Sequence, residues 1–133
     1  MDARAEPIWL DSKVAFAVHD RQLAEHGGAA GIRDAGALES ALERARNRWA
    51  YGEDDKCALA AALAFGVARN HPFADGNKRT AWVMARLFLG LNGVTLAFEE
   101  LDAIMIVLAL AAGELSEDEL AEWFRGRLAA SAG

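Results

Sequence analysis

Apolar and polar residues alternate along much of this chain with the period of an α-helix. The clearest case is the segment from Asp34 to about Asn47, where the apolar residues that share one helix face are Leu38, Ala41, Leu42 and Ala45. Charged residues fill positions between them and therefore point elsewhere. Asp34 is a residue type that favours the N-cap position. The pattern predicts an amphipathic helix that begins after Asp34 and packs one side against a core.

Two segments are apolar on nearly every side, which indicates helices surrounded by other parts of the protein. The run Cys57–Ala68 lies in a helix expected over roughly 55–69, and we place that helix at the centre of the fold. The run Ala103–Ala112 lies in a helix expected over about 99–112, and we interpret it as a second buried core helix. Both runs fall short of the roughly 20 residues that a membrane-spanning helix requires.

Capping residues and helix breakers delimit the other elements. Further helices are expected over 11–26, over 77–92 and from Ser116 onward, where Ser116 and Glu119 form a capping box. Between the helices, Gly27–Gly31 forms a loop and Val94–Phe98 is a short extended piece. The loop after the central helix begins at the residue before Pro72, because that position is disfavoured in helical geometry.

The expected fold is therefore all-α, a compact bundle of about six helices around the central apolar helix. No repeat, low-complexity segment or linker divides the sequence. We treat residues 1–133 as a single domain, with the ends 1–9 and 129–133 frayed.

Net charge and cysteine count exclude some classes of function. The net charge of −6 argues against a non-specific nucleic-acid binder, which needs a basic face, so no direct nucleic-acid contact is expected. A nucleotide needs only a local cationic pocket, so the net negative charge does not exclude nucleotide binding. The single cysteine, Cys57, excludes an internal disulfide and is interpreted as a small buried apolar residue. The chain opens without an apolar signal core, so we expect a cytoplasmic protein with no membrane partner.

The segment between the third and fourth expected helices differs from the rest. It reads His-Pro-Phe-Ala-Asp-Gly-Asn-Lys-Arg over 71–79. Asn77 is a strong N-cap type, so the amides after it lie at a helix N-terminus, which suits an anion such as phosphate. Gly76 lets the backbone approach a ligand closely. Lys78 and Arg79 oppose the helix dipole, and their placement makes sense if a polyphosphate binds among them.

Two further side chains of this loop supply reactive groups. Asp75 offers the hard carboxylate oxygen that Mg²⁺ prefers, with phosphate oxygens and water completing the shell. An imidazole such as that of His71 suits a general base that takes a proton from an attacking hydroxyl. Pro72 and Phe73 are interpreted as structural, the first stiffening the turn and the second anchoring a buried ring. The set matches phosphoryl-type transfer, although a lone histidine beside a helix start is more often only structural.

Other residues leave two interpretations open. Arg69 either reaches the phosphates or complements the C-terminal dipole of the central helix. His19 and His26 share a helix face but lie about 10 Å apart along it, too far to share a metal without a third element. They are expected to be a packing or surface pair. The loop Gly27–Gly31 is interpreted as a turn, with a flap over a target peptide as the alternative.

The motif over 71–79 resembles that of the Fic/Doc family. The Fic branch has glycine where Lys78 stands and a further arginine where Trp82 stands. Both departures favour the Doc branch, the death-on-curing toxins of toxin–antitoxin modules. Three further segments resemble Doc proteins in their order and spacing: His19-Asp20, residues 27–34 and Asn92-Gly93-Val94. The likeness covers roughly residues 10–128.

The resemblance implies a Fic-type helical bundle and a role for each matching residue. His71 would be the catalytic base and Asp75 the Mg²⁺ ligand. Gly76 with Asn77 would form the anion-binding turn, and Lys78 and Arg79 would hold phosphates. The pair His19-Asp20 would support the wall of the site.

Doc-type proteins are protein kinases that modify a threonine of translation elongation factor Tu. The resemblance therefore implies transfer of the γ-phosphoryl group of ATP, with Mg²⁺, to a protein hydroxyl, and arrest of translation. Lys78 adds charge where Fic enzymes seat their phosphates, and Trp82 removes a γ-phosphate clamp that Arg86 can partly replace. Two alternatives remain open: AMP transfer of the Fic type, and a catalytically silent helical domain that only binds a partner.

Control is expected from outside the chain. Fic enzymes are often silenced by an internal Ser/Thr-x-x-x-Glu-Gly/Asn helix, and Thr95 to Glu99 has this spacing but is followed by Glu100. The resemblance implies instead a separate, Phd-like antitoxin. Its C-terminal segment would fold into a groove of the toxin in a coupled folding and binding event.

Overall fold

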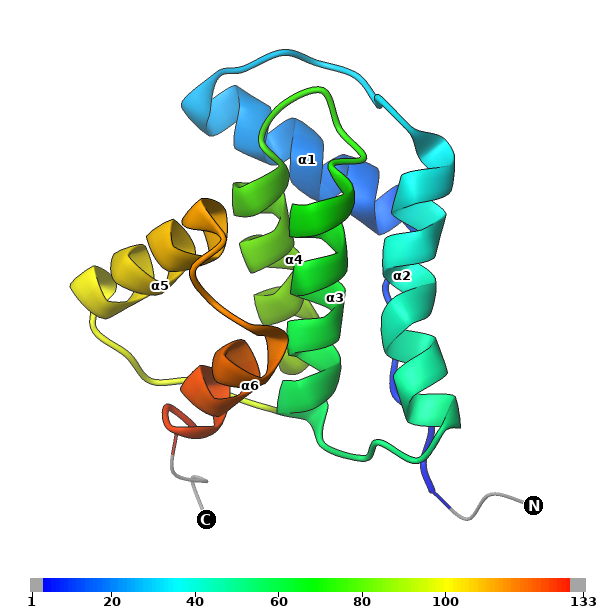
Figure 1. Ribbon diagram of the computed structural model, residues 1–133, viewed down its shortest axis with the longest axis vertical. Coiled ribbons are helices and arrows are strands. Elements are labelled where there is room, and N and C mark those ends of the chain that lie inside the picture. Colours follow the sequence, from blue (N-terminus) through cyan, green and yellow to red (C-terminus); the bar gives the residue numbers. More distant parts are fainter. Residues whose placement is uncertain (1–3, 130–133) are drawn as a thin grey trace.

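The computed structural model describes residues 4–129 and confirms the all-α class (Figure 1). The helices of this part are α1 (Ser12–His26), α2 (Ala35–Ala50), α3 (Lys56–Asn70), α4 (Asn77–Leu91), α5 (Glu100–Ala112) and α6 (Glu117–Arg125). Within the described residues no strand forms, and the extended pairing is limited to two isolated antiparallel bridges. The bundle of six helices that the apolar pattern predicts is therefore present.

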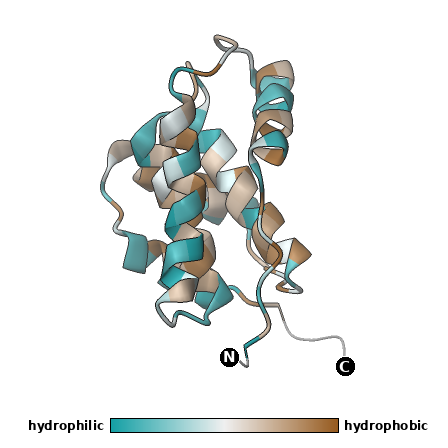
Figure 2. Cartoon of the chain, turned by 90° about the vertical axis from the view of Figure 1, so that its right-hand side faces the viewer, coloured by the Kyte–Doolittle hydropathy of each residue, from teal (hydrophilic) through white to brown (hydrophobic). Residues whose placement is uncertain are grey.

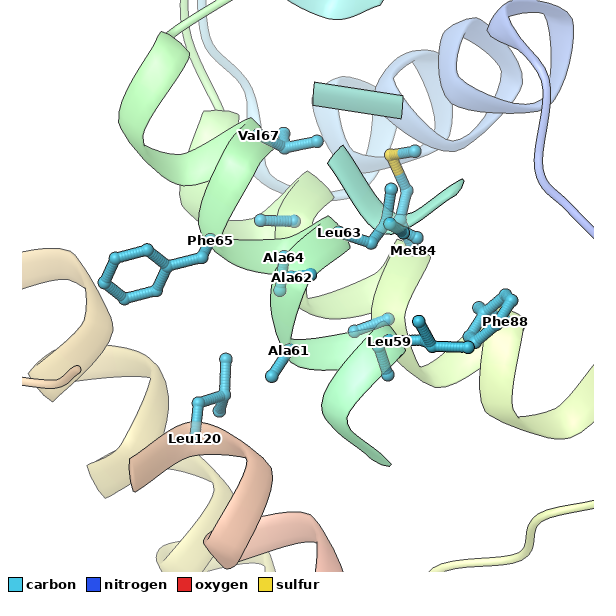
Figure 3. Close-up of a cluster of buried hydrophobic side chains, with 14 of the residues drawn as sticks. Leu59, Ala61, Ala62, Leu63, Ala64, Phe65, Val67, Met84, Phe88 and Leu120 are labelled. Atoms are coloured by element: carbon cyan, nitrogen blue, oxygen red, sulfur yellow. The ribbon is translucent and has the colours of Figure 1, made fainter. Parts of the chain in front are cut away.

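Helix α3 is the centre of the bundle, as its composition predicts. Every residue of Cys57–Ala68 is buried, and α2, α4 and α6 pack around it. Figure 3 shows Leu63 and Leu59 directed toward Met84 and Phe88 of α4. Leu120 of α6 approaches from another side, near Ala61 (Figure 3).

Small residues let α2 approach α3 closely. A β-carbon added at Gly66 would lie 3.0 Å from the Cα atom of Ala41, so the two helix backbones nearly touch there. On its other side α2 carries charged residues into solvent, which Figure 2 shows as hydrophilic colours on the surface that α2 presents. The amphipathic pattern of this helix thus has the predicted orientation, with Leu38 and Ala41 buried.

The interpretation of α5 as a buried core helix is wrong. Leu110 is the one residue of α5 that is fully buried, whereas Leu101, Met105 and Leu108 are 68%, 62% and 63% exposed. The reason is the location of the helix at the edge of the bundle, where it contacts α4 and one side of α3 (Figure 1). Since α2, α4 and α6 already cover α3, no partner within residues 4–129 remains for the outer face of α5.

Local capping follows the sequence. The side chain of Asp34 accepts a hydrogen bond from the Ala37 amide, and Ser116 with Glu119 forms the expected capping box of α6. The segment Val94–Phe98 is extended, and its backbone pairs with the chain after α6 through the bridge Leu96–Leu128.

The expectation of frayed ends concerns 1–9 and 129–133, of which 1–3 and 130–133 lie outside the described residues. Trp9 stacks on Phe88 with ring centroids 5.7 Å apart, and the Ile8 backbone hydrogen-bonds to the side chain of Asn92. Within residues 4–129 no helix is long and apolar enough to cross a membrane.

Candidate active site

The loop between α3 and α4 turns sharply at both ends. His71 ends α3 in a left-handed conformation, with φ 48° and ψ 55°. It is the one non-glycine residue of the described chain with a positive φ. Gly76, at φ 75°, is the N-cap of α4. A side chain other than glycine held in the left-handed region costs free energy, and such residues cluster at functional sites.

The loop between α1 and α2 pairs with this motif loop. Ile32 and Phe73 form an antiparallel bridge, and the Ala74 amide donates to Gly31 O at 3.0 Å. The amides of Arg33 and Asp34 both donate to Pro72 O. The glycine-rich stretch therefore does more than reverse the chain, since it lies alongside the motif and fixes its backbone. Whether it also covers a target peptide stays open as a prediction.

Phe73 is the buried anchor that the sequence predicts, at 1% exposure. The ring of His19, from α1, stacks on it in parallel with 4.0 Å between centroids. His19 Nε2 donates a hydrogen bond of 2.8 Å to the backbone carbonyl of Asp75, since a carbonyl can only accept. His19 is therefore a packing residue that also supports the wall of the site, while His26 is the last residue of α1 and is exposed.

The carboxylate of Asp75 is held by two backbone amides. Gly76 N donates to Oδ1 at 2.8 Å, and Ala29 N lies 3.4 Å from Oδ2. Gly28 passes so close that an added β-carbon would lie 2.9 Å from Oδ2. Sequence inspection missed Gly28 and Ala29, although a glycine at φ 122° within a glycine-rich stretch is the kind of position where backbone approaches another group.

The carboxylate of Asp75 fits a magnesium site in which the substrate supplies part of the ligands. No group of three or more histidine, cysteine, aspartate or glutamate side chains gathers in the described part of the chain. Mg²⁺ does not need such a cage, because it commonly binds one or two carboxylates together with substrate phosphates and water. Asp75 would hold the ion from the protein side, and phosphate oxygens and water would supply the remaining ligands.

The expectation that Asn77 caps α4 is wrong. Gly76 occupies the N-cap, and the side chain of Asn77 turns back to hold the backbone of Phe73. Its Oδ1 accepts from Phe73 N–H at 2.9 Å, and its Nδ2 donates to Phe73 O at 3.0 Å. The side chain is buried, so only the backbone amide of Asn77 is available to an anion. The Asn77 side chain bonds to Phe73 because the buried N–H and C=O groups of this loop residue need hydrogen-bond partners.

These elements enclose a cavity of about 460 Å³. Its lining residues are His71, Ala74, Asp75, Gly76, Asn77, Lys78, Arg79, Val107, Leu108 and Ala111. The imidazole, the carboxylate and the two cations of the motif are thus gathered around one space, with the inner face of α5 as the opposite wall. The first intrahelical bond of α4 runs from Thr80 N to Gly76 O, so the earlier amides are oriented toward this space.

A second hollow of about 570 Å³ continues from the first between α1, α4 and α5. Arg79, Val107 and Leu108 belong to both. Arg86 lines the second hollow as well, its guanidinium 5.1 Å from the Phe98 ring. A larger hollow of about 770 Å³ lies at the end of α2, where Arg44 and Arg48 pair with Glu117, and it contains none of the motif residues.

Arg69 is not brought into the motif cavity. Its guanidinium lies 4.6 Å from the ring of Phe65 and beside a small cavity shared with Arg44. The arginine that does contact the motif is Arg33, whose side chain donates to the backbone of His71 and Asn70. Its sequence position, about forty residues earlier, gives no local sign of this contact.

Comparison with known proteins agrees with this arrangement. A sequence model described as the Fic/DOC family matches residues 9–89. The chain is 38% identical over 111 residues to a protein named Protein kinase doc from Escherichia phage P1, covering 83% of this chain and 87% of the relative. It is 49% identical over 74 residues to a protein named Toxin Doc from Mycolicibacterium smegmatis (strain ATCC 700084 / mc(2)155), covering 53% and 56% of the two chains.

Proposed function

Because this chain belongs to the Fic/DOC family, we propose that it is a Doc-type toxin that transfers the γ-phosphoryl group of ATP to a hydroxyl group of a target protein. The observation that carries the proposal is the motif cavity, which His71, Asp75 and the cationic start of α4 line together. A general base, a carboxylate for a metal and a set of phosphate ligands are the components that phosphoryl transfer needs.

Each residue has a defined part in the transfer. His71 accepts the proton of the attacking hydroxyl while the oxygen forms a bond to the γ-phosphorus. The bond from that phosphorus to the bridging oxygen breaks, and ADP leaves with the electron pair. The amides at the start of α4, with Lys78 and Arg79, neutralise the phosphate oxygens. Asp75 would hold Mg²⁺, which supplies further charge neutralisation when bound.

Trp82 supports γ-phosphoryl transfer over AMP transfer. The ring is packed in an aromatic cluster, 5.5 Å from Trp123 and 5.9 Å from Phe124 between centroids. The position that carries a second arginine in the Fic branch is therefore filled by an apolar ring. Arg86 lies near it over Phe98, so it offers a cation beyond the motif cavity, next to Arg79. Arg69 remains outside the cavity and has no part in this scheme.

The outer face of α5 supports an external antitoxin as the partner. The second hollow has apolar walls from α4 and α5, and the exposed Leu101 and Met105 extend this surface. Arg79 and Arg86 of α4 line the same hollow together with Glu100, and neither arginine forms an ion pair with an acidic residue within the described chain. An amphipathic helix with leucine-like residues on one side and acidic residues on the other fits this surface. A Phd-like antitoxin that binds here would also cover the adjoining motif cavity.

The target is proposed to be translation elongation factor Tu, which places the activity in the cytoplasm and its effect on translation. The test uses the purified chain, Mg²⁺, elongation factor Tu and ATP labelled at either the α- or the γ-phosphorus. Label from the γ-position on the factor, lost in His71→Ala, supports the proposal. Label from the α-position would establish AMP transfer instead.

A catalytically silent domain makes a different prediction. In that case neither label reaches the factor or any other protein of a cell extract, and His71→Ala leaves growth arrest unchanged. The Lys78→Gly variant tests the branch more finely. Its loss of γ-transfer, or a change to α-transfer, would show that the lysine determines which phosphorus faces the nucleophile.

A further inference from the structure

Arg33 reaches the motif from the loop between α1 and α2. Its Nε donates to His71 O at 2.7 Å, and its second terminal nitrogen donates to Asn70 O at 2.9 Å. The backbone amide of Arg33 donates to Pro72 O at 2.7 Å. One residue thus holds the carbonyl groups of three consecutive residues, beginning at the last residue of α3.

These three carbonyls belong to the part of the chain that directs the imidazole of His71. The last carbonyls of a helix lack partners within it, and a left-handed residue at its end is usually glycine. His71 adopts that conformation with a side chain, at φ 48°. The guanidinium, whose forked donors suit two neighbouring acceptors, therefore compensates a conformation that the chain would otherwise disfavour.

We propose that Arg33 is the positioning residue of the catalytic base: it fixes the left-handed backbone of His71 and thereby directs the imidazole into the motif cavity. The inference rests on the proposed function of His71. Arg33 does not line that cavity, and its side chain bonds to the backbone of Asn70 and His71, so its proposed role is carried by the backbone of His71. The phosphate ligands come from α4, which Arg33 does not contact through its side chain.

This separation gives a kinetic expectation. In Arg33→Met, which retains an unbranched apolar stem, kcat should fall about tenfold or more because a misplaced base loses much of its contribution. KM for ATP should stay within about twofold, since the nucleotide ligands are unchanged. Arg33→Lys should recover part of kcat, because an ammonium group can donate to one carbonyl but lacks the fork. Methylguanidine added to Arg33→Ala should recover activity as well.

Arg48→Met is the matched control. Arg48 also joins distant parts of the chain, pairing with Glu53 and Glu117, but at the far end of α2. It should lower the thermal midpoint without altering kcat of the folded protein. If Arg33→Met behaves in the same way, with kcat unchanged, or if kcat falls and neither lysine nor methylguanidine restores it, Arg33 is only a cap of α3 and the proposal is wrong.

A spectroscopic measurement separates this inference from the proposed activity. The chain has three histidines, so selective ¹³C,¹⁵N-histidine labelling gives three sets of resonances. In Arg33→Met the backbone carbonyl and imidazole signals of His71 should shift or broaden, while those of His26, which forms no hydrogen bond or ion pair with the motif loop in the described part of the chain, stay in place. Unmoved His71 signals would refute the positioning role even in an active enzyme. Wild-type protein that transfers no phosphate would refute the proposed function and leave this measurement decisive.

Discussion

Replacing Asn77 tests whether its amide serves the loop or a ligand. In the structure the side chain forms two buried hydrogen bonds with the backbone of Phe73, one accepted and one donated. Asn77→Ala removes both partners at once. The Phe73 ring lies in the core at 1% exposure, so its backbone groups have little access to replacement water. The substitution should therefore act first on stability.

The size of the effect follows from these two groups. Each buried donor or acceptor left without a partner costs about 1–3 kcal/mol, so the pair should cost roughly 2–6 kcal/mol. That is a large part of the roughly 5–15 kcal/mol by which a domain of this kind is stable. Asn77→Asp should be no milder. Its carboxylate can still accept from Phe73 N–H, but it cannot donate to Phe73 O and brings a buried charge beside it.

Urea unfolding followed by circular dichroism measures the loss, and isothermal titration with ATP and Mg²⁺ measures binding to the folded fraction. Asn47→Ala is the control, since Asn47 is an exposed asparagine of α2, and its effect should stay within about 0.5 kcal/mol. An Asn77→Ala protein as stable as wild type, but with weakened ATP binding, would refute the reasoning. The amide would then belong to the phosphate site.

Three further substitutions test other parts of the molecule. Gly28→Ala should raise the Mg²⁺ concentration for half-maximal transfer about tenfold, because its β-carbon would displace the Asp75 carboxylate. Gly27→Ala is the control, since Gly27 also has a positive φ but open space around it, and equal effects of the two variants would contradict the predicted clash. Met105→Asp should weaken antitoxin binding, measured by calorimetry, at least tenfold and leave phosphate transfer unchanged. Tyr51→Asp, at the distant end of α2, should leave antitoxin binding unchanged, and an unaltered affinity in Met105→Asp would exclude α5 from the interface. Burial raises the pKa of the Cys57 thiol from 9.0 to about 11, so between these pH values the thiol ionises mainly in the unfolded state. The free energy of unfolding should therefore fall as the pH rises through this range, and a fall of equal size in Cys57→Ala would assign the effect to other groups.

The helices could be predicted because their determinants are local. Asp34 and Ser116 cap the helices that follow them, and the continuous apolar character of Cys57–Ala68 requires surroundings on every side. The motif could be predicted for the same reason, since its reactive residues are consecutive and the turn between two helices gathers them around one cavity.

Contacts between segments distant in the sequence could not be predicted in this way. The pairing of Arg33 with the His71 carbonyl joins two loops that lie 38 residues apart. The stacking of His19 on Phe73 depends on how α1 crosses the start of α4. The prediction for Asn77 is wrong for a related reason. Its residue type favours an N-cap, but its side chain bonds instead to the backbone N–H and C=O of Phe73 in the adjoining loop. Residue type defines what a side chain can bond to, and the tertiary fold decides which partner is in reach.

Helix α5 shows why an apolar run does not by itself imply burial within the chain. Its composition matches that of a core helix, yet Leu101 and Met105 are exposed on its outer side, and Leu108, which also lines the motif cavity, is exposed as well. Isolated apolar residues on a surface are ordinary, whereas several exposed apolar residues on one helix favour a binding site. The inner side of the same helix forms a wall of the motif cavity. A partner that binds the outer side of α5 and extends over Leu108 would border the proposed nucleotide site, so it would obstruct that cavity without any change in the proposed catalytic residues.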